Sequence, residues 1–315
     1  YGGAIYVACD YVTIDNSIFT RCIAYGKDGG ALFVAGSNID ITHSNFIENR
    51  VTGSDAHGGS IYIQGNNVGL EDCNFVRCSA VEGGTIYVNG SNIRIEESST
   101  TFSLAEIGGA VYVAGNNVTI CHFDSSFNNA TSKGGSIYIE GDDANIYNAD
   151  FMIFGATQNG GAIYVEGDGA TISNATFQLG SARDGGAIYV EGANTMINAS
   201  SFANIGTNVS AASVNYTTFG GAIYVAGDDT TISYSNFTHT NSGRGGAIYV
   251  AGKGTEIGHG SFYELNAGNG SAIYVEGHNT NVHDSSFIKN VANYDGGSVY
   301  LGGVNASVTS SVFSM

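Results

Sequence analysis

A short glycine-rich pattern recurs along the whole chain and limits what it can fold into. The pattern is Gly-Gly, a small residue, an aliphatic residue, Tyr and a second aliphatic residue, as in segment 160–165. Self-similarity at a spacing of roughly 25 to 35 residues is typical of solenoids, propellers and repeat arrays. Counting close variants, there are twelve copies, which begin at Gly2, Gly29, Gly58, Gly83, Gly108, Gly134, Gly160, Gly185, Gly220, Gly245, Gly270 and Gly296.

A phenylalanine closes every copy. Its distance from the first glycine is the same in ten copies, as from Gly160 to Phe177, and two residues longer in the fourth and fifth, at Phe102 and Phe127. The distance from this residue to the next copy varies, so one half of each unit is held in register and the other is a loop that tolerates insertion. The longest loop spans residues 203–219. Functional residues tend to lie in such insertions; a tolerated insertion without a task is the alternative.

The half of each copy that is held in register reads as strands and turns. Alternation along a strand places Ile163 and Val165 on one face and Ala162 and Tyr164 on the other. Exposed aliphatic residues would cost about 25 cal/mol per Å² of apolar surface, so the aliphatic face must be the interior. A glycine two residues after this strand, followed two residues later by Asn, Asp or Gly, predicts a tight turn. A second short strand and a third, which carries the phenylalanine, complete the copy.

The residue types exclude the helical alternatives, because Gly, Asn, Thr, Val and Tyr are poor helix formers. Propeller blades need four strands and about 40 to 50 residues. The sequence therefore predicts an all-β, right-handed parallel β-helix solenoid of about twelve coils, with three short strands per coil. We expect one domain over residues 1–315, with twelve repeats of about 26 residues. The handedness follows the general rule for parallel crossovers.

Stacked coils align equivalent residues in columns, so the closing phenylalanines, Phe102 and Phe127 among them, should form an inner stack in the core, and the tyrosines should form an outer stripe. Only Ala, Ser or Thr lies beside each of them, which predicts a flat aromatic surface with no charge in its own columns. Tyrosine stacks well on sugar faces and is enriched at interfaces. A stripe that merely reinforces coil stacking is the alternative. The candidate binding residues are Tyr62, Tyr87, Tyr112, Tyr138, Tyr164, Tyr189, Tyr224, Tyr249 and Tyr274.

Composition narrows the possible partners. The chain has 28 acidic and 10 basic residues, a net charge of −18, and would be repelled by a nucleic acid backbone. No apolar run approaches the length of a membrane-spanning helix. The five cysteines occupy mostly unrelated columns and predict no disulfide framework, and the seven histidines show no ligand spacing. We expect no cofactor.

The residues for catalysis are sparse. The segment 258–260, with His259 between two glycines, is the only fragment similar to a polygalacturonase motif, and the Asp pairs at 142–143 and 228–229 lie at turns, away from it. The sequence therefore predicts no catalytic residues and a protein that is not an enzyme. Glu140, Glu166 and Glu191 share one column and could offer oxygen ligands to Ca²⁺, but no calcium-binding nonapeptide is present, so we expect no metal and leave calcium open.

The paired signature of Gly-Gly-Ala-Ile, as at 185–188, and Phe-x-x-Asn, as at Phe46/Asn49 and Phe287/Asn290, resembles the chlamydial polymorphic membrane protein repeat. It is also similar to the β-helix repeats of adhesin-like surface proteins of methanogenic archaea. The resemblance implies right-handed parallel β-helices exposed outside the cell, and it brings no catalytic residues. Because the sequence begins and ends inside the repeat, we expect a piece of a longer protein or a mature product.

Taken together, these features predict a non-enzymatic, extracellular structural or adhesive protein of the cell surface that acts as a stalk, adhesin or fibre. It would associate with itself, laterally or end to end, or with surface glycans or proteins. The alternatives are a head-to-tail filament or sheath subunit and, less favoured, a polysaccharide-active β-helix enzyme. Ten Asn-x-Ser/Thr sequons are candidate glycosylation sites in a secreted protein, at Asn89, Asn117, Asn129, Asn174, Asn198, Asn208, Asn215, Asn236, Asn269 and Asn305.

Overall fold

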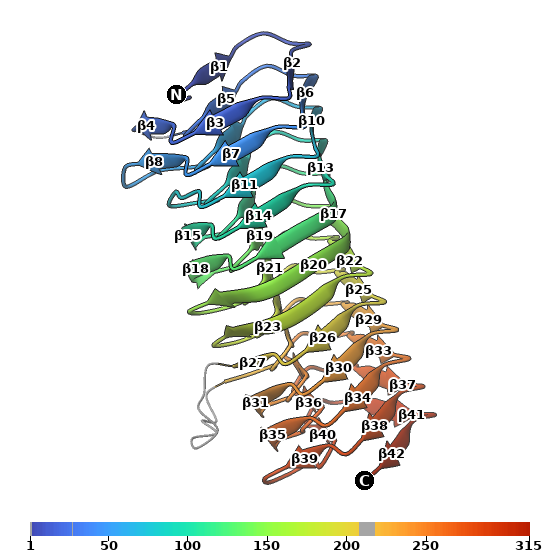
Figure 1. The fold of residues 1–315 in the computed structure, drawn as a ribbon. Coiled ribbons are helices and arrows are strands. Elements are labelled where there is room, and N and C mark those ends of the chain that lie inside the picture. The colour runs from blue at the N-terminus through green and yellow to red at the C-terminus, as the bar shows by residue number, and fades with distance from the viewer. Residues whose placement is uncertain (1, 27, 208–217) are drawn as a thin grey trace. The chain divides into compact units, whose positions relative to one another are not determined.

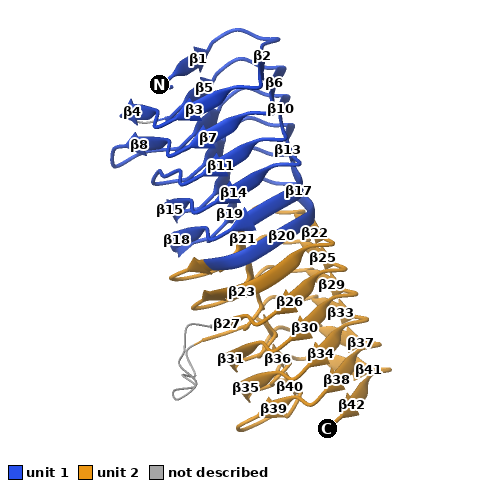
Figure 2. Ribbon diagram, in the orientation of Figure 1, with its two compact units in different colours: residues 1–154 blue, residues 155–315 orange. Residues whose placement is uncertain are grey.

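The computed structural model describes residues 2–26, 28–207 and 218–315, and within them it contains strands, turns and bends but no helix. The chain divides into two compact units, unit 1 (Tyr1–Phe154) and unit 2 (Gly155–Met315), shown in Figure 2. Each unit holds six copies of the repeat, stacked as the coils of a parallel β-helix (Figure 1). The predicted fold class is confirmed, whereas the prediction of one domain over 1–315 stays a prediction.

The glycine-rich pattern forms the first strand of each coil, and successive copies pair in parallel with equivalent residues opposite one another. In unit 1 these strands are β1 (Ile5–Val7), β5 (Leu32–Val34), β9 (Ile61–Ile63), β12 (Ile86–Val88), β16 (Val111–Val113) and β19 (Ile137–Ile139). In unit 2 they are β21 (Ile163–Val165), β24 (Ile188–Val190), β28 (Ile223–Val225), β32 (Ile248–Val250), β36 (Ile273–Val275) and β40 (Val299–Leu301).

The second and third strands of each coil follow the tight turn. In unit 1 they are β2 (Thr13–Asp15), β3 (Ile18–Thr20), β6 (Ile39–Thr42), β7 (Asn45–Ile47), β10 (Val68–Glu71), β11 (Asn74–Val76), β13 (Ile93–Glu96) and β14 (Ser99–Thr101). The second and third strands merge in β17 (Val118–Ser126) and in β20 (Asn145–Ala156), whose last two residues belong to unit 2. In unit 2 they are β22 (Thr171–Ser173), β23 (Thr176–Ala182), β25 (Met196–Asn198), β26 (Ser201–Ala203), β29 (Thr231–Ser233), β30 (Asn236–Thr238), β33 (Glu256–Gly258), β34 (Ser261–Tyr263), β37 (Asn281–His283), β38 (Ser286–Ile288), β41 (Ser307–Thr309) and β42 (Val312–Ser314).

The variable half of the coil, expected to be a loop, also contains short strands. They occur where the segment before the next Gly-Gly runs beside its equivalent in the adjacent coil, as β4 does with β8. In unit 1 they are β4 (Ile23–Tyr25), β8 (Arg50–Thr52), β15 (Leu104–Ile107) and β18 (Asn129–Lys133). In unit 2 they are β27 (Gly206–Thr207), β31 (Asn241–Arg244), β35 (Asn266–Asn269) and β39 (Val291–Ala292).

The tight turn after the first strand is confirmed. Asn38, Asn194 and Asp229 have φ angles of 57°, 55° and 53°, in the left-handed region that these residues tolerate. The glycine before this turn is required for a different reason: a Cβ on Gly192 would lie 1.9 Å from the carbonyl oxygen of Gly167. Only glycine lets the coils approach so closely.

The core is a set of ladders along each unit. Phenylalanine rings stack in unit 2 from Phe177 to Phe313, with centroids 4.7 to 4.9 Å apart. In unit 1 the ladder is interrupted, because Thr100 and Ser125 pair with the positions of Phe75 and Phe151. The expectation that Phe102 and Phe127 lie in the core is therefore wrong.

Phe102 and Phe127 instead lie on exposed turns with positive φ, two residues beyond the inner position. Their spacing from the first glycine, longer by two residues than in the other copies, is the signal that separates them from the core phenylalanines. In the fifth coil the fully buried Phe123, two residues before the inner position of Ser125, supplies an inner ring.

The side chain of the asparagine in Phe-x-x-Asn links adjacent coils, and it is fully buried at Asn49 and half-buried at Asn290. The Asn49 side chain accepts a hydrogen bond from the Cys22 amide (2.9 Å) and donates one to the Phe19 carbonyl (3.1 Å). Asn290 makes the same pair of bonds with Leu265 and Phe262. The motif therefore satisfies backbone groups that the turn leaves without a strand partner.

All five cysteines are free thiols, and all lie in unit 1. Cys73, Cys78 and Cys121 are buried, and burial raises the pKa of the Cys73 thiol to about 11. These three cysteines therefore serve as small core residues.

Candidate functional site

The tyrosine column forms a stacked ladder in each unit. In unit 1 the Tyr62 and Tyr87 rings lie 5.1 Å apart, and in unit 2 the Tyr189 and Tyr224 rings lie 4.6 Å apart. The remaining predicted binding residues, Tyr112, Tyr138, Tyr164, Tyr249 and Tyr274, belong to the same two ladders. The structure thus brings the predicted residues together within each unit.

The ladders are less exposed than the sequence predicts. The rings of Tyr112, Tyr138, Tyr164, Tyr249 and Tyr274 are buried, and those of Tyr62, Tyr87, Tyr189 and Tyr224 are half-buried. The residue just before each Gly-Gly covers them: His57 lies 4.7 Å from the Tyr87 ring, Phe219 lies 4.8 Å from Tyr249, and the Arg244 guanidinium lies 5.3 Å from Tyr274. The expectation of an open, flat aromatic surface is therefore wrong, because residues of the adjacent column cover the rings, although the tyrosine column itself carries no charge. Binding by these tyrosines stays a prediction.

The predicted glutamate column accepts hydrogen bonds from the tyrosine ladder. The Tyr112 hydroxyl donates a hydrogen bond of 2.8 Å to Glu140, and the Tyr164 hydroxyl donates one to Glu191. Burial and the Glu140 hydrogen bond both raise the pKa of Tyr112. Because phenol hydroxyls already engage Glu140 and Glu191, the structure adds no support for a calcium site formed with Glu166.

A charged cluster that the sequence did not predict lies beside the tyrosine ladder of unit 1. His57 contacts Asp28 through Nδ1 (2.7 Å) and Glu82 through Nε2 (3.3 Å). Burial raises the pKa of Glu82 above its usual value. All three residues directly precede a Gly-Gly pair, so their shared position in the repeat could have predicted the cluster.

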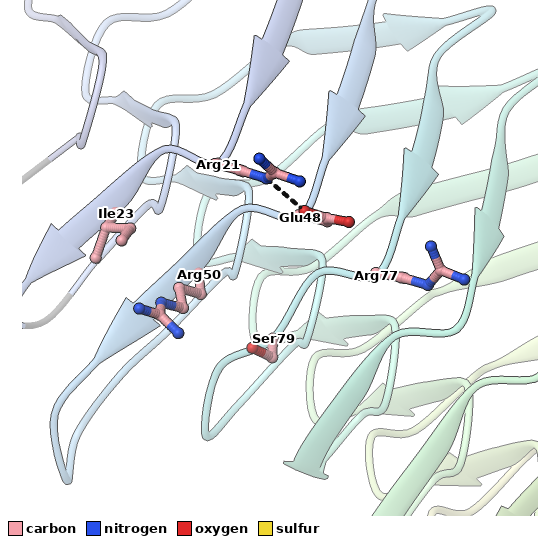
Figure 3. A pocket seen from close by; sticks show the side chains of 6 residues that line it. All are labelled: Arg21, Ile23, Glu48, Arg50, Arg77 and Ser79. Atoms are coloured by element: carbon pink, nitrogen blue, oxygen red, sulfur yellow. Dashed lines mark hydrogen bonds and ion pairs between the residues drawn. The ribbon is translucent and has the colours of Figure 1, made fainter.

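A pocket with a volume of about 360 Å³ lies on the outside of unit 1. Two adjacent columns from three consecutive coils line it (Figure 3). One column lies on the turn after the third strand and the other at the start of the fourth strand, where Ile23 pairs with Arg50 and Arg50 with Ser79. The lining residues are Arg21, Glu48 and Arg77 from the first column, and Ile23, Arg50 and Ser79 from the second.

The pocket is positively charged. It gathers three of the chain's ten basic residues and one acid, so its lining carries a formal charge of +2 (three guanidinium groups and one carboxylate). Arg21 pairs with Glu48 at 2.7 Å, and this pairing lowers the pKa of the Glu48 carboxyl. Arg50 is exposed, and within the described residues no carboxylate pairs with it. Figure 3 shows Arg50 and Arg77 extending away from the Arg21–Glu48 pair.

An aromatic surface continues the first column of the pocket. Arg77 lies 5.6 Å from the centre of the Phe102 ring, which stacks on Phe127 at 4.7 Å. Both phenylalanines are exposed, by 48% and 38%. The outer turns of unit 1 thus present a guanidinium and apolar rings side by side.

The glycosylation candidates occupy different surroundings. Asn89, Asn129, Asn174 and Asn236 are exposed, and Asn198 and Asn269 are half-buried. The side-chain amide nitrogens of Asn117 and Asn305 donate to Asn92 and Asn279 in asparagine ladders, which a glycan on that nitrogen would interrupt. Asn208 and Asn215, with most of the predicted insertion loop 203–219, lie outside the described residues.

The histidines cluster after all. The described residues include two groups of ligand-type side chains whose donor atoms lie within 4.8 Å of one another: Glu96, Cys121 and His122, and His259, His283 and Asp284. The expectation that histidines show no ligand spacing is wrong because stacking brings together residues that lie one whole coil apart along the chain, as His259 and His283 do.

No family model matches this chain, and no curated protein matches it. Among solved structures, it is similar in fold to the tailspike protein of Escherichia coli bacteriophage HK620 in complex with a pentasaccharide, at 13% identity and a TM-score of 0.47 over 98% of this chain. A tailspike mutant in complex with a hexasaccharide gives 12% identity and a TM-score of 0.44 over 96% of this chain. The chain spans about 59% and 58% of the length of those two proteins. At this identity the likeness concerns the fold alone.

These neighbours correct one expectation. The sequence predicts a protein that is not an enzyme. The solved structures to which this chain is similar in fold are tailspike proteins in complex with oligosaccharides. The prediction that this protein is not an enzyme is therefore wrong.

The predicted partners and location are tested only in part. Within the described residues no helix is both long and apolar enough to cross a membrane. Self-association, lateral or end to end, stays a prediction.

Proposed function

We propose that this chain belongs to an extracellular β-helical surface protein that adheres to anionic polysaccharide through the arginine pocket of unit 1. One observation carries the proposal: Arg21, Arg50 and Arg77 line a single pocket in a chain whose net charge is −18. The proposal rests on this pocket and not on the tailspike likeness.

The chemistry of the pocket favours a carboxylate or sulfate group. A guanidinium presents paired N–H donors that match the two oxygens of such a group. Arg50 has no carboxylate partner within the described residues, and the hydroxyl of half-buried Ser79 can add a hydrogen bond. Since Glu48 already occupies Arg21, Arg50 and Arg77 are the residues expected to contact the anion.

The overall negative charge does not prevent this binding. Interactions between exposed charges are screened beyond about 8 Å at physiological salt, so the distant acidic residues act weakly on an anion already in the pocket. They repel a long polyanion during its approach. We therefore expect short anionic oligosaccharides to bind more tightly per sugar than long chains.

Phe102 and Phe127 extend the site to the body of a sugar. Apolar C–H faces of pyranose rings pack on exposed aromatic rings, and these two rings form one stacked surface beside Arg77. The ligand class is thus an oligosaccharide with an acidic group at one sugar and an apolar face on the next.

The resemblance to chlamydial polymorphic membrane proteins and archaeal adhesin-like proteins supports a location at the cell surface. Exposed sequons such as Asn129 and Asn174, in a chain with few basic residues, are in keeping with an external protein. Under this proposal the β-helix acts as a stiff scaffold that presents the pocket.

Calorimetric titration with trigalacturonate, and with maltotriose as the neutral comparison, tests the proposal. We expect trigalacturonate to bind and maltotriose not to bind. Arg50→Gln and Arg77→Gln should each weaken binding about tenfold or more, the loss of a charged hydrogen-bonding partner. Arg94→Gln makes the same charge change on an exposed residue of unit 1 outside the pocket and should leave binding unchanged.

Two results would overturn the proposal: no binding of trigalacturonate, or equal weakening by Arg94→Gln and Arg50→Gln. Release of new reducing ends from longer oligogalacturonates, measured on the same samples, distinguishes binding alone from binding followed by cleavage.

A further inference from the structure

Three ligand-type side chains of unit 2 meet where the equivalent outer turns of two consecutive coils lie side by side. His259 directly follows β33, and His283 and Asp284 lie at the end of the next equivalent strand, β37. One donor atom from each lies within 4.8 Å of the other two. Two imidazoles and a carboxylate are the donor set that zinc and similar divalent transition metals prefer.

The neighbouring coil is shaped to receive the His283 ring. Gly258 is paired with His283 in the strand register, and a Cβ built on Gly258 would lie 2.4 Å from Cε1 and 2.6 Å from Nε2 of His283. The equivalent residue in the preceding coil is Ser233, whose side chain the ring could not tolerate at this place. The absence of a side chain at 258 is therefore what lets His283 lie over the adjacent coil.

Both rings are held in position by further contacts. The Nε2 atom of His283 lies 3.0 Å from Glu256, and its Nδ1 atom lies 2.9 Å from Asp284. A carboxylate that accepts the second N–H of an imidazole fixes its tautomer, an arrangement common around metal-bound histidines. The His259 ring stacks on Tyr234, with centroids 4.5 Å apart and planes 10° from parallel.

We infer that His259, His283 and Asp284 bind Zn²⁺ and thereby link two consecutive coils of unit 2, with Glu256 orienting His283. The ligands are His283 through Nδ1, the Asp284 carboxylate and one ring nitrogen of His259. Three protein ligands leave a fourth tetrahedral position for water or an external donor. Because His259 and Asp284 are exposed, the ion can enter from solvent.

The other cluster, in unit 1, is less suited to a cation. The Glu96 carboxylate pairs with Arg94, so a positive charge already occupies the position next to the acid. The Nε2 atom of His122 is hydrogen-bonded to Asn148, and its Nδ1 atom lies 4.0 Å from Glu96. The inference therefore applies to unit 2 alone and predicts one tight zinc site per chain.

The test is calorimetric titration of the EDTA-treated chain with Zn²⁺, with Mg²⁺ as the comparison ion. The substitutions use residues that the same columns already contain: His259→Asn matches Asn174, and His283→Asn matches Asn198. His239→Asn is the matched control, because His239 also lies on a positive-φ turn of unit 2, where Asn204 occupies the equivalent position in the coil before it. Melting curves in EDTA show whether each variant folds.

We expect one Zn²⁺ per chain and no Mg²⁺. Glu256→Gln should weaken zinc binding about 10- to 100-fold, and loss of either histidine ligand should weaken it more. Gly258→Ser keeps every ligand but displaces the His283 ring, so it should also weaken binding, whereas His239→Asn should not. Failure of the original chain to bind Zn²⁺ stoichiometrically would overturn the inference. Equal affinity in Gly258→Ser and the original chain would overturn it too, as would an equal loss in His239→Asn and His259→Asn. None of these results depends on oligosaccharide binding.

Discussion

The two units fill the interior of the β-helix with different core layers. Unit 2 stacks a continuous phenylalanine ladder from Phe177 to Phe313, whereas unit 1 replaces two rungs with Thr100 and Ser125. The polar rungs remain fully buried because Asn128 donates hydrogen bonds to both hydroxyls and to the Thr100 carbonyl, at 2.9 to 3.1 Å. A β-helix coil thus accepts either an apolar layer or a polar layer whose hydroxyls are hydrogen-bonded by a buried amide.

The largest effect should come from the apolar ladder. Phe237→Ala removes a ring that is 1% exposed and flanked by stacked rings on both sides, so unfolding free energy should fall by about 3 to 5 kcal/mol. Urea denaturation measures this loss. Phe102→Ala, on an exposed turn, should cost under about 1 kcal/mol; a comparable loss there would show that Phe102 belongs to the core.

The polar layer of unit 1 should be the next most sensitive. Asn128→Ala leaves the Ser103 amide, which Asn128 Oδ1 accepts at 2.7 Å, and the Thr100 carbonyl without this partner. We expect a loss of about 2 to 3 kcal/mol in the same denaturation experiment. The exposed neighbour provides the control, since Asn129→Ala should change stability by less than about 0.5 kcal/mol. Equal effects would mean that the buried amide does not hold the layer together.

A smaller effect of opposite sign should appear at Glu82. Burial raises its folded-state pKa above the ordinary value of 4.5, so ionised Glu82 destabilises the fold as pH rises through the folded-state pKa. Glu82→Gln should therefore raise the melting temperature at pH 7 and leave it unchanged near pH 4. The gain in unfolding free energy at pH 7 should be under about 1 kcal/mol. A lower melting temperature at pH 7 would show instead that the His57–Glu82 contact dominates.

The smallest effect should come from Glu264 in unit 2, where the sign reverses. Hydrogen bonds from Tyr263, Lys289 and His239 lower the pKa of this partly exposed carboxyl to about 2. Its stabilising contribution is thus complete above pH 4.5 and is lost as pH falls toward 2. Glu264→Gln should lower the melting temperature slightly at pH 6 and have no effect at pH 2, and high salt should reduce the difference.

The repeat was enough to predict the fold because backbone alternation and turn chemistry are local. Positive-φ residues such as Asn38 and the aliphatic pairs of the first strand fall where the pattern predicts them. The assignment of Phe102 and Phe127 to the core failed because residue type was weighed above register. Thr100 and Ser125, as far from their own first glycines as Phe177 is from Gly160, hold the inner positions. Spacing, rather than hydrophobicity, identified the interior.

The sequence by itself determined the coil, its inner columns and its turns, since each depends on residues within one repeat. Only the tertiary structure decided which outer side chains meet. Arg21, Arg50 and Arg77 come from three coils, and His259 and His283 from two. The burial of the tyrosine ladder likewise depends on residues such as His57 that lean across from the adjacent column. The sequence alone does not predict these contacts, because variable loops separate the partners along the chain. The direction of each side chain also depends on the conformation of its turn.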